Sequence, residues 1–440
     1  MKYFGTDGIR STFDSGFLTD KFAFALGKAV GKFIEIKNLK PKKILLAKDT
    51  RPSGEILLNA FYSGLSECKI SGISAGIIPT PALALCISKK NFAMGVMVTA
   101  SHNPVHDNGF KFFNSNGNKL QNSDEEIIEG LIEIKNGFLS NNTFLETTNS
   151  AKDLYFNHLV KNFPKGILKG KKIVADLANG ATKETTPRIL SDMGAKVVSI
   201  NTGNGKINEF VGSEYPSVLS DEVKLHSADF GIAHDGDGDR VIFCDSEGRI
   251  IKGDKILGLL AIHEKKQGRL PSNSIVATIH SNSGLQHSLK KYGITLHSSS
   301  VGDRFVAQKL KEIDTTLGGE SSGHIIANNI APSGDGLLTA LLISRVLYES
   351  AGSLFELAEQ ISLWPCKEGS FFVKEKIPLD SCYSLKKGLE DANRILNKDG
   401  RILLRYSGTE PKIRLLVEAI ESTVVEEIFT EIAKIIEDEL

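Results

Sequence analysis

Apolar runs and amphipathic stretches alternate along most of the chain. Residues 17–36 carry apolar side chains at helical spacing, and Thr19 is placed to cap that helix. Residues 42–49 form a short apolar run that ends in charge, which is typical of a buried parallel strand. A second helix is expected to begin at Ser53, and strands and helices then alternate up to a strand at 93–100. The pattern predicts an α/β unit with a helix-covered sheet.

The chain divides at three places, near residues 150, 251 and 366. A polar stretch rich in asparagine and serine, residues 136–150, predicts a domain boundary. From about residue 367 the expected order changes to strand, helix, strand, strand, helix, which predicts a smaller α+β unit. The expected fold class is α/β, with three α/β domains with mixed sheets and a smaller α+β C-terminal domain. The expected domains cover residues 1–150, 151–251, 252–366 and 367–440.

Composition adds little that is specific. The chain has 440 residues, of which 41% are hydrophobic, and 53 Lys and Arg balance 53 Asp and Glu. A net charge of zero gives no reason to expect nucleic acid or a membrane surface as partner. The five cysteines form no C-x-x-C pair, which favours reduced thiols, and no apolar run approaches the roughly 18 residues that span a bilayer. We expect a soluble, cytoplasmic enzyme.

The most informative string is HDGDGDR. Asp235, Asp237 and Asp239 alternate with glycines after an apolar strand. In an extended loop, residues two apart point the same way, so the three carboxylates can converge. Unpaired, they would repel one another, so they need a cation, and hard oxygen ligands favour Mg²⁺ or Ca²⁺. A solvated acidic turn is the alternative.

An EF-hand does not fit this string. Its sixth position would be Arg240, where glycine is expected, and its twelfth would be Ser246, where a bidentate glutamate is expected. Mg²⁺ commonly completes its shell with phosphate oxygens. The string therefore favours a magnesium site beside a phosphate group.

A second string, RYSGTEPKIR, fits a grip on a phosphate monoester. Ser407, Gly408 and Thr409 offer two hydroxyls and backbone N–H groups in a turn after a strand, and Arg405 and Arg414 flank them. A nest of N–H donors with guanidinium groups on either side binds such an anion. An ordinary hairpin loop with surface arginines is the alternative.

A third string, LGGESSGHII, places Glu320, Ser322 and His324 in alternation with small residues. A period of two would put these polar groups on one side, which suits recognition of sugar hydroxyls. Turn residues exposed to solvent are the alternative reading.

The fourth string is TASHNP, just past the end of an expected strand. Ser101 has no G-x-S-x-G elbow around it, so a hydrolase triad is not indicated, and His102 need not be its base. Taken alone, the string is most simply a turn before proline. Beside a metal loop, a phosphate grip and a polyol loop, a serine that carries a phosphoryl group fits best.

TASHNP, DGDGDR, GESSGH and SGTEP, in this order, resemble the α-D-phosphohexomutase superfamily. The opening FGTDGIR and the segments INEFVGSEYP and 231–261 are most similar to its bacterial branch that acts on glucosamine phosphate. The likeness runs from Tyr3 to near Val417. It implies four domains around a central cleft, each of which contributes one loop.

The resemblance also implies roles for individual residues. Ser101 corresponds to the family's phosphoserine, and Lys111 to the lysine proposed as general acid and base. The implied Mg²⁺ ligands are Ser101, through its phosphoryl group, and Asp235, Asp237 and Asp239. Other implied catalytic residues are Arg10, His102 and Arg240. The implied substrate-binding residues are Glu320, Ser322, His324, Arg405, Ser407, Gly408, Thr409 and Arg414.

The implied reaction converts glucosamine 6-phosphate into glucosamine 1-phosphate through a sugar bisphosphate, which also primes the enzyme, in UDP-N-acetylglucosamine synthesis. Two residues depart from the family pattern: Ser321 replaces a usual glutamine, and Tyr406 a usual proline. Ser321 keeps mannose or glucose phosphates open as alternative substrates. A non-catalytic phosphosugar-binding regulator is a further alternative.

The implied mechanism sets two physical expectations. Lys111 must have a lowered pKa to take a hydroxyl proton, and we expect Arg10 and Arg240 to lower it. The bisphosphate must turn over in the site, so we expect the last domain to move and open the cleft. A hexosamine phosphate is the expected partner, and a homodimer is one candidate assembly.

Overall fold

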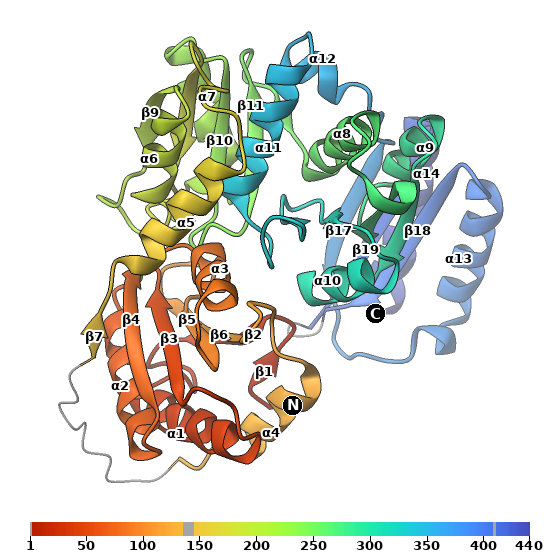
Figure 1. Ribbon diagram of the computed structural model, residues 1–440. Coiled ribbons are helices and arrows are strands. Elements are labelled where there is room, and N and C mark those ends of the chain that lie inside the picture. Colours follow the sequence, from red (N-terminus) through yellow and green to blue (C-terminus); the bar gives the residue numbers. More distant parts are fainter. Residues whose placement is uncertain (1, 135–144, 408–410) are drawn as a thin grey trace.

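The computed structural model describes residues 2–134, 145–407 and 411–440. Within these ranges the strands form four sheets, shown with their helices in Figure 1. Part of the predicted boundary at 136–150 lies outside the described residues, as do the predicted site residues Gly408 and Thr409. The sheets define four successive units, here named the first, second, third and C-terminal units.

The first unit contains a mixed sheet of strand order β1-β2-β6-β5-β3-β4-β7, with β3, β4 and β5 parallel and β6 antiparallel to β5. Buried strands such as β5 have apolar side chains on both faces, as expected where helices cover a sheet. The elements are β1 (Phe4–Gly5), β2 (Gly8–Thr12), α1 (Asp20–Ile36), β3 (Lys43–Lys48), α2 (Gly54–Glu67), β4 (Ser71–Ile77), α3 (Thr80–Lys89), β5 (Met94–Val98), β6 (Asp107–Asn114), α4 (Asn122–Gly130) and β7 (Glu146–Thr147).

The second unit contains a sheet of order β12-β11-β10-β8-β9, in which β8, β9 and β10 are parallel, β11 is antiparallel to β10, and β12 is antiparallel to β11. Its elements are α5 (Ser150–Lys161), β8 (Lys172–Asp176), α6 (Thr185–Asp192), β9 (Lys196–Ile200), the 3₁₀ turn Gly212–Glu214, α7 (Pro216–Leu225), β10 (Phe230–His234), β11 (Val241–Asp245) and β12 (Ile250–Ile251).

The third unit contains a sheet of order β14-β13-β15-β16, parallel except for β16. Its elements are α8 (Gly253–Lys266), the 3₁₀ turn Pro271–Asn273, β13 (Ser274–Thr278), α9 (Ser283–Lys291), β14 (Thr295–Ser299), α10 (Asp303–Glu312), β15 (Leu317–Gly319), β16 (Ile325–Ala327), α11 (Gly336–Glu349) and α12 (Leu354–Ala358).

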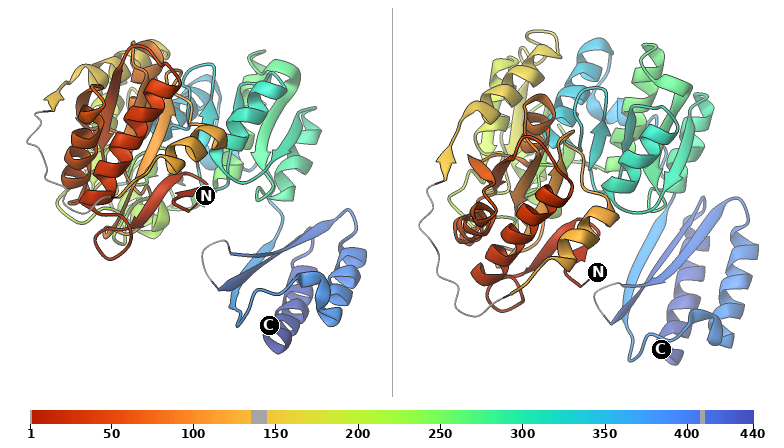
Figure 2. Two further views of the ribbon diagram at one scale, coloured as in Figure 1. Left: turned by 90° about the horizontal axis from the view of Figure 1, so that it is seen from below. Right: turned by 60° about the horizontal axis from the view of Figure 1, so that its bottom comes forward.

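The C-terminal unit has an antiparallel sheet of order β17-β19-β18 with two long helices on one face. Both views of Figure 2 show it standing apart from the first unit and joined through the third. Its elements are β17 (Cys366–Phe372), the 3₁₀ turn Leu379–Ser381, α13 (Tyr383–Leu396), β18 (Gly400–Tyr406), β19 (Lys412–Ala419) and α14 (Ser422–Glu439).

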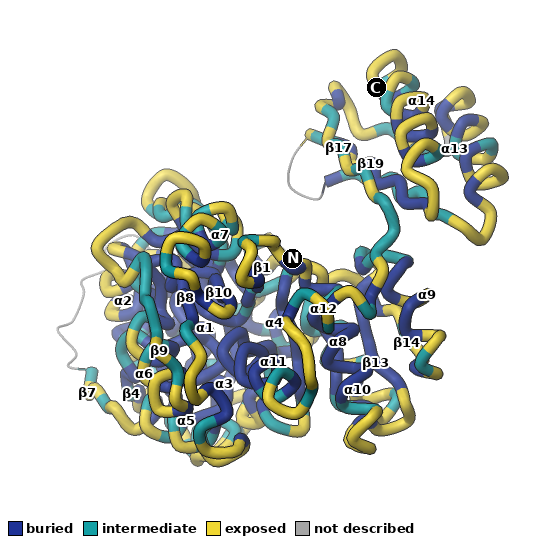
Figure 3. The backbone as a smooth tube through the Cα atoms, turned by 90° about the horizontal axis from the view of Figure 1, so that it is seen from above, coloured by how far each residue is buried: buried dark blue, intermediate teal, exposed yellow. Residues whose placement is uncertain are grey.

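The core follows the same division. One cluster of buried apolar side chains runs from the first sheet through the second into the third, whereas the C-terminal unit packs a cluster of its own. Figure 3 shows this as a large body with a buried interior and a smaller, separate one. The fold is thus three α/β units with mixed sheets and a smaller C-terminal unit, as predicted. Among the described residues, no helix is both long enough and apolar enough to cross a membrane.

Local expectations had mixed outcomes. Thr19 caps α1, since its hydroxyl accepts a hydrogen bond from the backbone N–H of Phe22, which confirms the prediction. Ser53 precedes α2 as predicted but makes no side-chain cap, because its hydroxyl instead accepts from the Asn108 amide at 2.8 Å. The strand expected at the start of the C-terminal unit is β17, which spans Cys366–Phe372.

Candidate active site

Ser101 lies in a loop that begins at the carboxyl end of β5, the edge of an α/β sheet where ligands bind. The residue is buried, and its φ of 52° is in the left-handed region that few non-glycine residues adopt. Its hydroxyl donates a 2.7 Å hydrogen bond to Oδ2 of Asp235, in the loop after β10. The first and second units thus meet at this serine.

Sequence reasoning missed the ion pair that shapes this loop. Asp49 and Arg51, both buried, follow β3, which is the strand next to β5. The Arg51 guanidinium donates to the backbone carbonyls of Ser101 at 2.9 Å and Asn103 at 2.7 Å. The Asp49 carboxylate accepts from the hydroxyl of Thr99, which in turn accepts from the N–H of Ser101. These bonds fix the loop's strained conformation. The available signal was the same as for Ser101, namely polar residues directly after a buried strand.

The three predicted metal ligands come together. Asp235, Asp237 and Asp239 are buried, and each offers an oxygen that lies within 4.8 Å of the others. The geometry behind this differs from the prediction, because residues 235–240 form a tight turn and not an extended loop. Gly238 has a φ of 75° there, and Asp235 Oδ1 accepts its N–H at 3.1 Å.

This donor set suits a hard cation. One oxygen of Asp237 and one of Asp239 are buried without a hydrogen-bond partner among the described residues. Burial and repulsion from these two carboxylates raise the pKa of Asp235 well above its ordinary value. A divalent cation would give the two unpaired oxygens a partner and would offset the repulsion among the carboxylates, since buried carboxylates need compensating charge.

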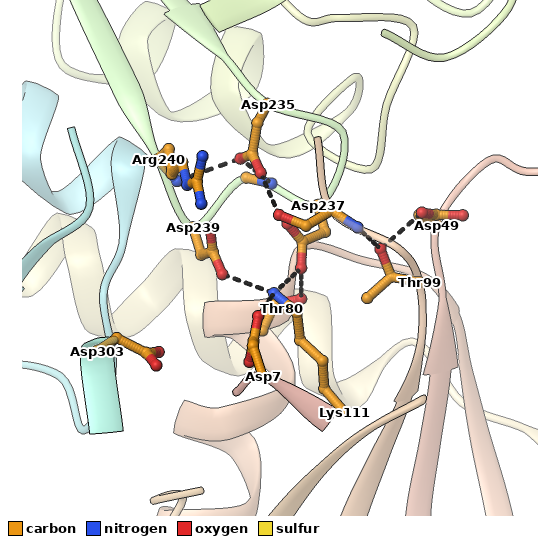
Figure 4. Close-up of polar contacts among 12 residues, drawn as sticks. Asp7, Asp49, Thr80, Thr99, Lys111, Asp235, Asp237, Asp239, Arg240 and Asp303 are labelled. Atoms are coloured by element: carbon orange, nitrogen blue, oxygen red, sulfur yellow. Dashed lines mark hydrogen bonds and ion pairs between the residues drawn. The ribbon is translucent and has the colours of Figure 1, made fainter. Parts of the chain in front are cut away.

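Lys111 of β6 reaches this cluster from below, as Figure 4 shows. Its ammonium lies 2.7 Å from Asp237, 2.8 Å from Asp239 and 3.3 Å from Asp7. Burial alone would lower the pKa of Lys111, but the three carboxylates outweigh burial and hold the pKa well above its ordinary value. Arg10 does lower this pKa, but the carboxylates outweigh it, so the expected lowered pKa of Lys111 is wrong for this arrangement.

The other predicted catalytic residues, Arg10, His102 and Arg240, lie in the same region as Ser101 and Lys111. Arg10 donates to the Asn103 side chain at 3.3 Å and pairs with Asp7. Burial, with help from the positive charges of Arg240 and Arg10, lowers the pKa of His102 to about 3, so its imidazole is neutral at pH 7. The guanidinium of Arg240 lies beside the aspartates and 3.6 Å from Glu214.

The loop at 320–324, here the sugar loop, is not the alternating segment that was predicted. It is a tight turn between β15 and β16, closed by a bond from the N–H of Gly323 to the carbonyl of Glu320. Ser322 lies 3.4 Å from the Glu320 carboxylate. His324 is buried instead, 3.5 Å from Asp239. Burial lowers the pKa of His324, but Asp239 and Asp303 outweigh it and raise the pKa to about 9.

The phosphate grip is described only in part. Arg405 of β18 and Arg414 of β19 are directly opposed in the antiparallel ladder. Together with His280 of the third unit they line a cavity of about 410 Å³ between the two units. Ser407 is buried, its N–H donating to the carbonyl of Lys412 at 2.8 Å and its carbonyl accepting from Lys376. The structure thus places the two predicted arginines together.

Three further charged residues join the site without having been predicted. Asp7 contacts the side chains of Arg10, Lys111 and Lys119, and Lys119 also lies 2.5 Å from Asp303 at the start of α10. Burial is unfavourable for Asp7, but these cations hold its pKa well below its ordinary value. Their pairing joins segments about 100 to 180 residues apart, which no local pattern reveals.

Comparison with known proteins gives the family. Models of the phosphoglucomutase/phosphomannomutase α/β/α domains I, II and III match residues 1–136, 153–248 and 252–363, and the model of the C-terminal domain matches residues 373–435. The chain belongs to this family. It is therefore a phosphohexomutase, an isomerase that moves a phosphoryl group within a sugar phosphate, and metal use is general in such enzymes.

Full-length relatives give a finer likeness. A phosphoglucosamine mutase of Nitratiruptor sp. is 38% identical over all of both chains, and one of Helicobacter pylori is 39% identical over all of both. One of Aliarcobacter butzleri is 40% identical over 97% of each chain. Among solved structures, a phosphoglucomutase/phosphomannomutase family protein of Burkholderia thailandensis shares the fold, with a TM-score of 0.82, 22% identity and 99% and 97% of the two chains covered.

Proposed function

We propose that this phosphohexomutase interconverts glucosamine 6-phosphate and glucosamine 1-phosphate through a phosphoserine at Ser101. The hydrogen bond of 2.7 Å from Ser101 to Asp235 carries the proposal. It places the hydroxyl that would hold the phosphoryl group at the edge of three converging carboxylates. The choice of amino sugar is supported by full-length relatives named phosphoglucosamine mutase.

Ser101 and the three aspartates would hold Mg²⁺, which would draw negative charge off the phosphoryl group as it is transferred. The family's use of metal and the fit of the donor set support this assignment. Arg240, beside the aspartates, would add positive charge at the same group. Neutral His102 would add a hydrogen-bonding imidazole at no cost in charge repulsion.

In the proposed reaction the bond between Ser101 Oγ and phosphorus breaks as the sugar's 1-hydroxyl oxygen bonds to phosphorus. The hydroxyl proton passes to Lys111. Lys111 can accept this proton only when its side chain is neutral. In the described arrangement the carboxylates of Asp237 and Asp239 keep Lys111 protonated, so these two ion pairs must first be broken. Lys111 then gives a proton to the departing Ser101 oxygen. The sugar bisphosphate turns around, and its 6-phosphoryl group bonds to Ser101 Oγ as the bond between phosphorus and the sugar's 6-oxygen breaks. Lys111 passes the Ser101 hydroxyl proton to that 6-oxygen, which leaves glucosamine 1-phosphate.

Binding would involve both other units. Arg405 and Arg414 would grip the phosphate that does not react, since paired guanidinium groups bind such an anion well. Ser407, Gly408 and Thr409 would complete the grip. Glu320, Ser322 and His324 would bind sugar hydroxyls, and a single grip serves both orientations of the bisphosphate.

The test measures kcat/KM for glucosamine 6-phosphate, mannose 6-phosphate and glucose 6-phosphate, with Mg²⁺ and a sugar bisphosphate primer. The amino sugar should lead, and Ser101→Ala should abolish turnover of all three while leaving the protein folded. A lead for mannose or glucose would contradict the substrate and direct attention to Ser321, where the family usually has glutamine. Turnover by the Ser101→Ala variant would contradict the phosphoserine.

A further inference from the structure

The start of α10 lies between the sugar loop and the first unit. The backbone N–H of Gly302 donates a 3.0 Å hydrogen bond to the Glu320 carboxylate. The next residue, Asp303, holds its carboxylate 3.4 Å from Nε2 of His324. Two consecutive residues at one helix end therefore hold two side chains of the sugar loop.

The first unit holds this helix end in turn. The Lys119 ammonium lies 2.5 Å from Asp303 and also pairs with Asp7. Asp7 is the carboxylate that contacts Lys111 at 3.3 Å and pairs with Arg10. Figure 4 shows Asp303 on the third unit, across from Asp7 and Asp239. A continuous chain of ion pairs therefore runs from the floor of the Ser101 site to the sugar loop.

The ion pair between Lys119 and Asp303 is mostly buried. The Lys119 side chain is 10% exposed and that of Asp303 is 12% exposed. A mostly buried ammonium between carboxylates of two domains is stable only where both partners are within reach, because an unpaired buried charge is costly. The position of Asp303 relative to the first unit is therefore tied to the Lys119 ammonium.

We propose that Lys119 and Asp303 are positioning residues that fix the position of the sugar loop relative to the Ser101 loop. This inference rests on the proposed function, in which the sugar loop holds the hydroxyls of the substrate while Ser101 exchanges a phosphoryl group. Removing the ammonium leaves Asp303 without its partner in the first unit, and Glu320 and His324 then shift relative to Ser101. A displacement of about 1 Å costs roughly 100-fold in rate where transfer needs an in-line arrangement.

A second ion pair at the same interface provides the matched control. Arg304 donates to both oxygens of the Glu125 carboxylate, at 2.6 and 2.9 Å, and Glu125 is buried. This pair also joins α10 to the first unit, but neither side chain has a contact with the sugar loop among the described residues. Breaking it weakens the interface, while Lys119 keeps both of its ion pairs, with Asp7 and Asp303.

The experiment compares Lys119→Met, Asp303→Asn and Lys119→Arg with Glu125→Gln. We expect kcat/KM for glucosamine 6-phosphate to fall about 100-fold in Lys119→Met and to stay near wild type in Glu125→Gln, although both variants lose thermal stability. Lys119→Arg, which keeps the charge, should recover most of the activity. The double variant Lys119→Met/Asp303→Asn should be little worse than either single variant, because the two residues act as one pair.

Two readouts separate positioning from other roles. Phosphorylation of Ser101, measured by intact mass, should be unchanged in Lys119→Met, because the donor side keeps Arg51 and the aspartates. Binding of glucosamine 6-phosphate by calorimetry should weaken about tenfold in Lys119→Met, equivalent to one lost hydrogen bond, and not in Glu125→Gln.

The binding readout needs no turnover, so it stands even if the wild type fails as a mutase. Weaker binding in Lys119→Met alone then supports the positioning role while the proposed function fails. Equal binding and activity in Lys119→Met and Glu125→Gln overturn the inference. Loss of Ser101 phosphorylation in Lys119→Met also overturns it, because Lys119 would then act on the donor side.

Discussion

Arg51 and Asp49 form an ion pair at 3.0 Å with both side chains fully buried, directly beneath the loop that carries Ser101. The guanidinium also donates to four backbone carbonyls of that loop, those of Ser101, Asn103, Pro104 and Asp107. One buried cation therefore serves four carbonyls of this segment, and the Asn208 amide donates to two of them, those of Ser101 and Asn103. The Arg51 guanidinium thus helps to hold the unusual backbone of Ser101.

Replacing Arg51 by Met should remove both stability and activity. The change leaves the Asp49 carboxylate without its cationic partner and removes the guanidinium donor from four carbonyls, and breaking a buried pair costs about 3–5 kcal/mol. Urea unfolding should show this loss, and Ser101 should no longer become phosphorylated. Lys48→Met is the control, since Lys48 pairs with the exposed Glu55 at 3.4 Å and should cost about 1 kcal/mol or less. A stable, phosphorylated Arg51→Met variant would contradict this account.

Local patterns predicted the parts of the site that are local in the chain. The three aspartates come from a single turn, and the opposed arginines from the two strands of one ladder, so spacing alone brings each group together. The α/β order and the helix cap at Thr19 likewise follow from periodicity and side-chain chemistry.

Features that depend on three-dimensional packing were not predictable in this way. The pKa of Lys111 is set by carboxylates from β1–β2 and the aspartate turn, which outweigh the arginines that sequence reasoning considered. The pairing of Lys119 with Asp303 joins two units, and nothing in either segment indicates the other. The turn at 320–324 replaces an expected alternation because two glycines flank a reversal between β15 and β16.

Metal binding should show competition with Lys111. Its ammonium lies between Asp237 and Asp239, where a cation would also bind, so Lys111→Met should bind Mn²⁺ more tightly than wild type. Asp237→Asn should bind it at least about tenfold more weakly. Titration with Mn²⁺ followed by electron paramagnetic resonance measures both affinities, with exposed Glu247→Gln as control. Weaker Mn²⁺ binding by Lys111→Met would show that Lys111 supports the cation site instead of competing for it.

A buried carboxyl in the third unit should make stability depend on pH. Burial raises the pKa of Asp254 from 3.8 to about 6, although its carboxylate accepts the N–H of Asn282 at 2.9 Å. The folded state therefore binds this proton more tightly than the unfolded state. The stabilising effect is complete below pH 4 and is lost as pH rises through about 6.

Asp254→Asn should remove this dependence, because asparagine keeps a carbonyl acceptor for Asn282 and has no proton to lose. Relative to wild type, the variant should gain up to about 3 kcal/mol as pH rises from 4 to 7. Thermal unfolding at a series of pH values measures the difference between the two curves. Curves that stay parallel over this range would place the Asp254 pKa near its ordinary value.

A bidentate ion pair between Arg401 and Glu418, here called the fork, lies in the C-terminal unit and hydrogen-bonds to the third unit. Arg401 of β18 donates twice to the buried Glu418 carboxylate of β19, at 2.9 Å each. Its remaining donors reach the carbonyls of Ile279 and Ser281 at 2.7 Å, and Glu418 accepts from the hydroxyl and N–H of Ser283. The same sheet carries Arg405 and Arg414, so the fork fixes the orientation of these two arginines relative to the third unit.

Arg401→Met should therefore loosen the grip without harming the donor side. We expect KM for the hexose phosphate to rise about tenfold, which is the loss of one hydrogen bond to a charged group, while the extent of Ser101 phosphorylation stays as in wild type. Arg401→Lys should not restore KM, because an ammonium lacks the planar fork that spans both Glu418 and the carbonyls. Lys367→Met, which breaks an exposed pair with Glu426 inside the C-terminal unit, is the matched control. An unchanged KM in Arg401→Met would mean that substrate itself, and not this fork, orients the C-terminal unit.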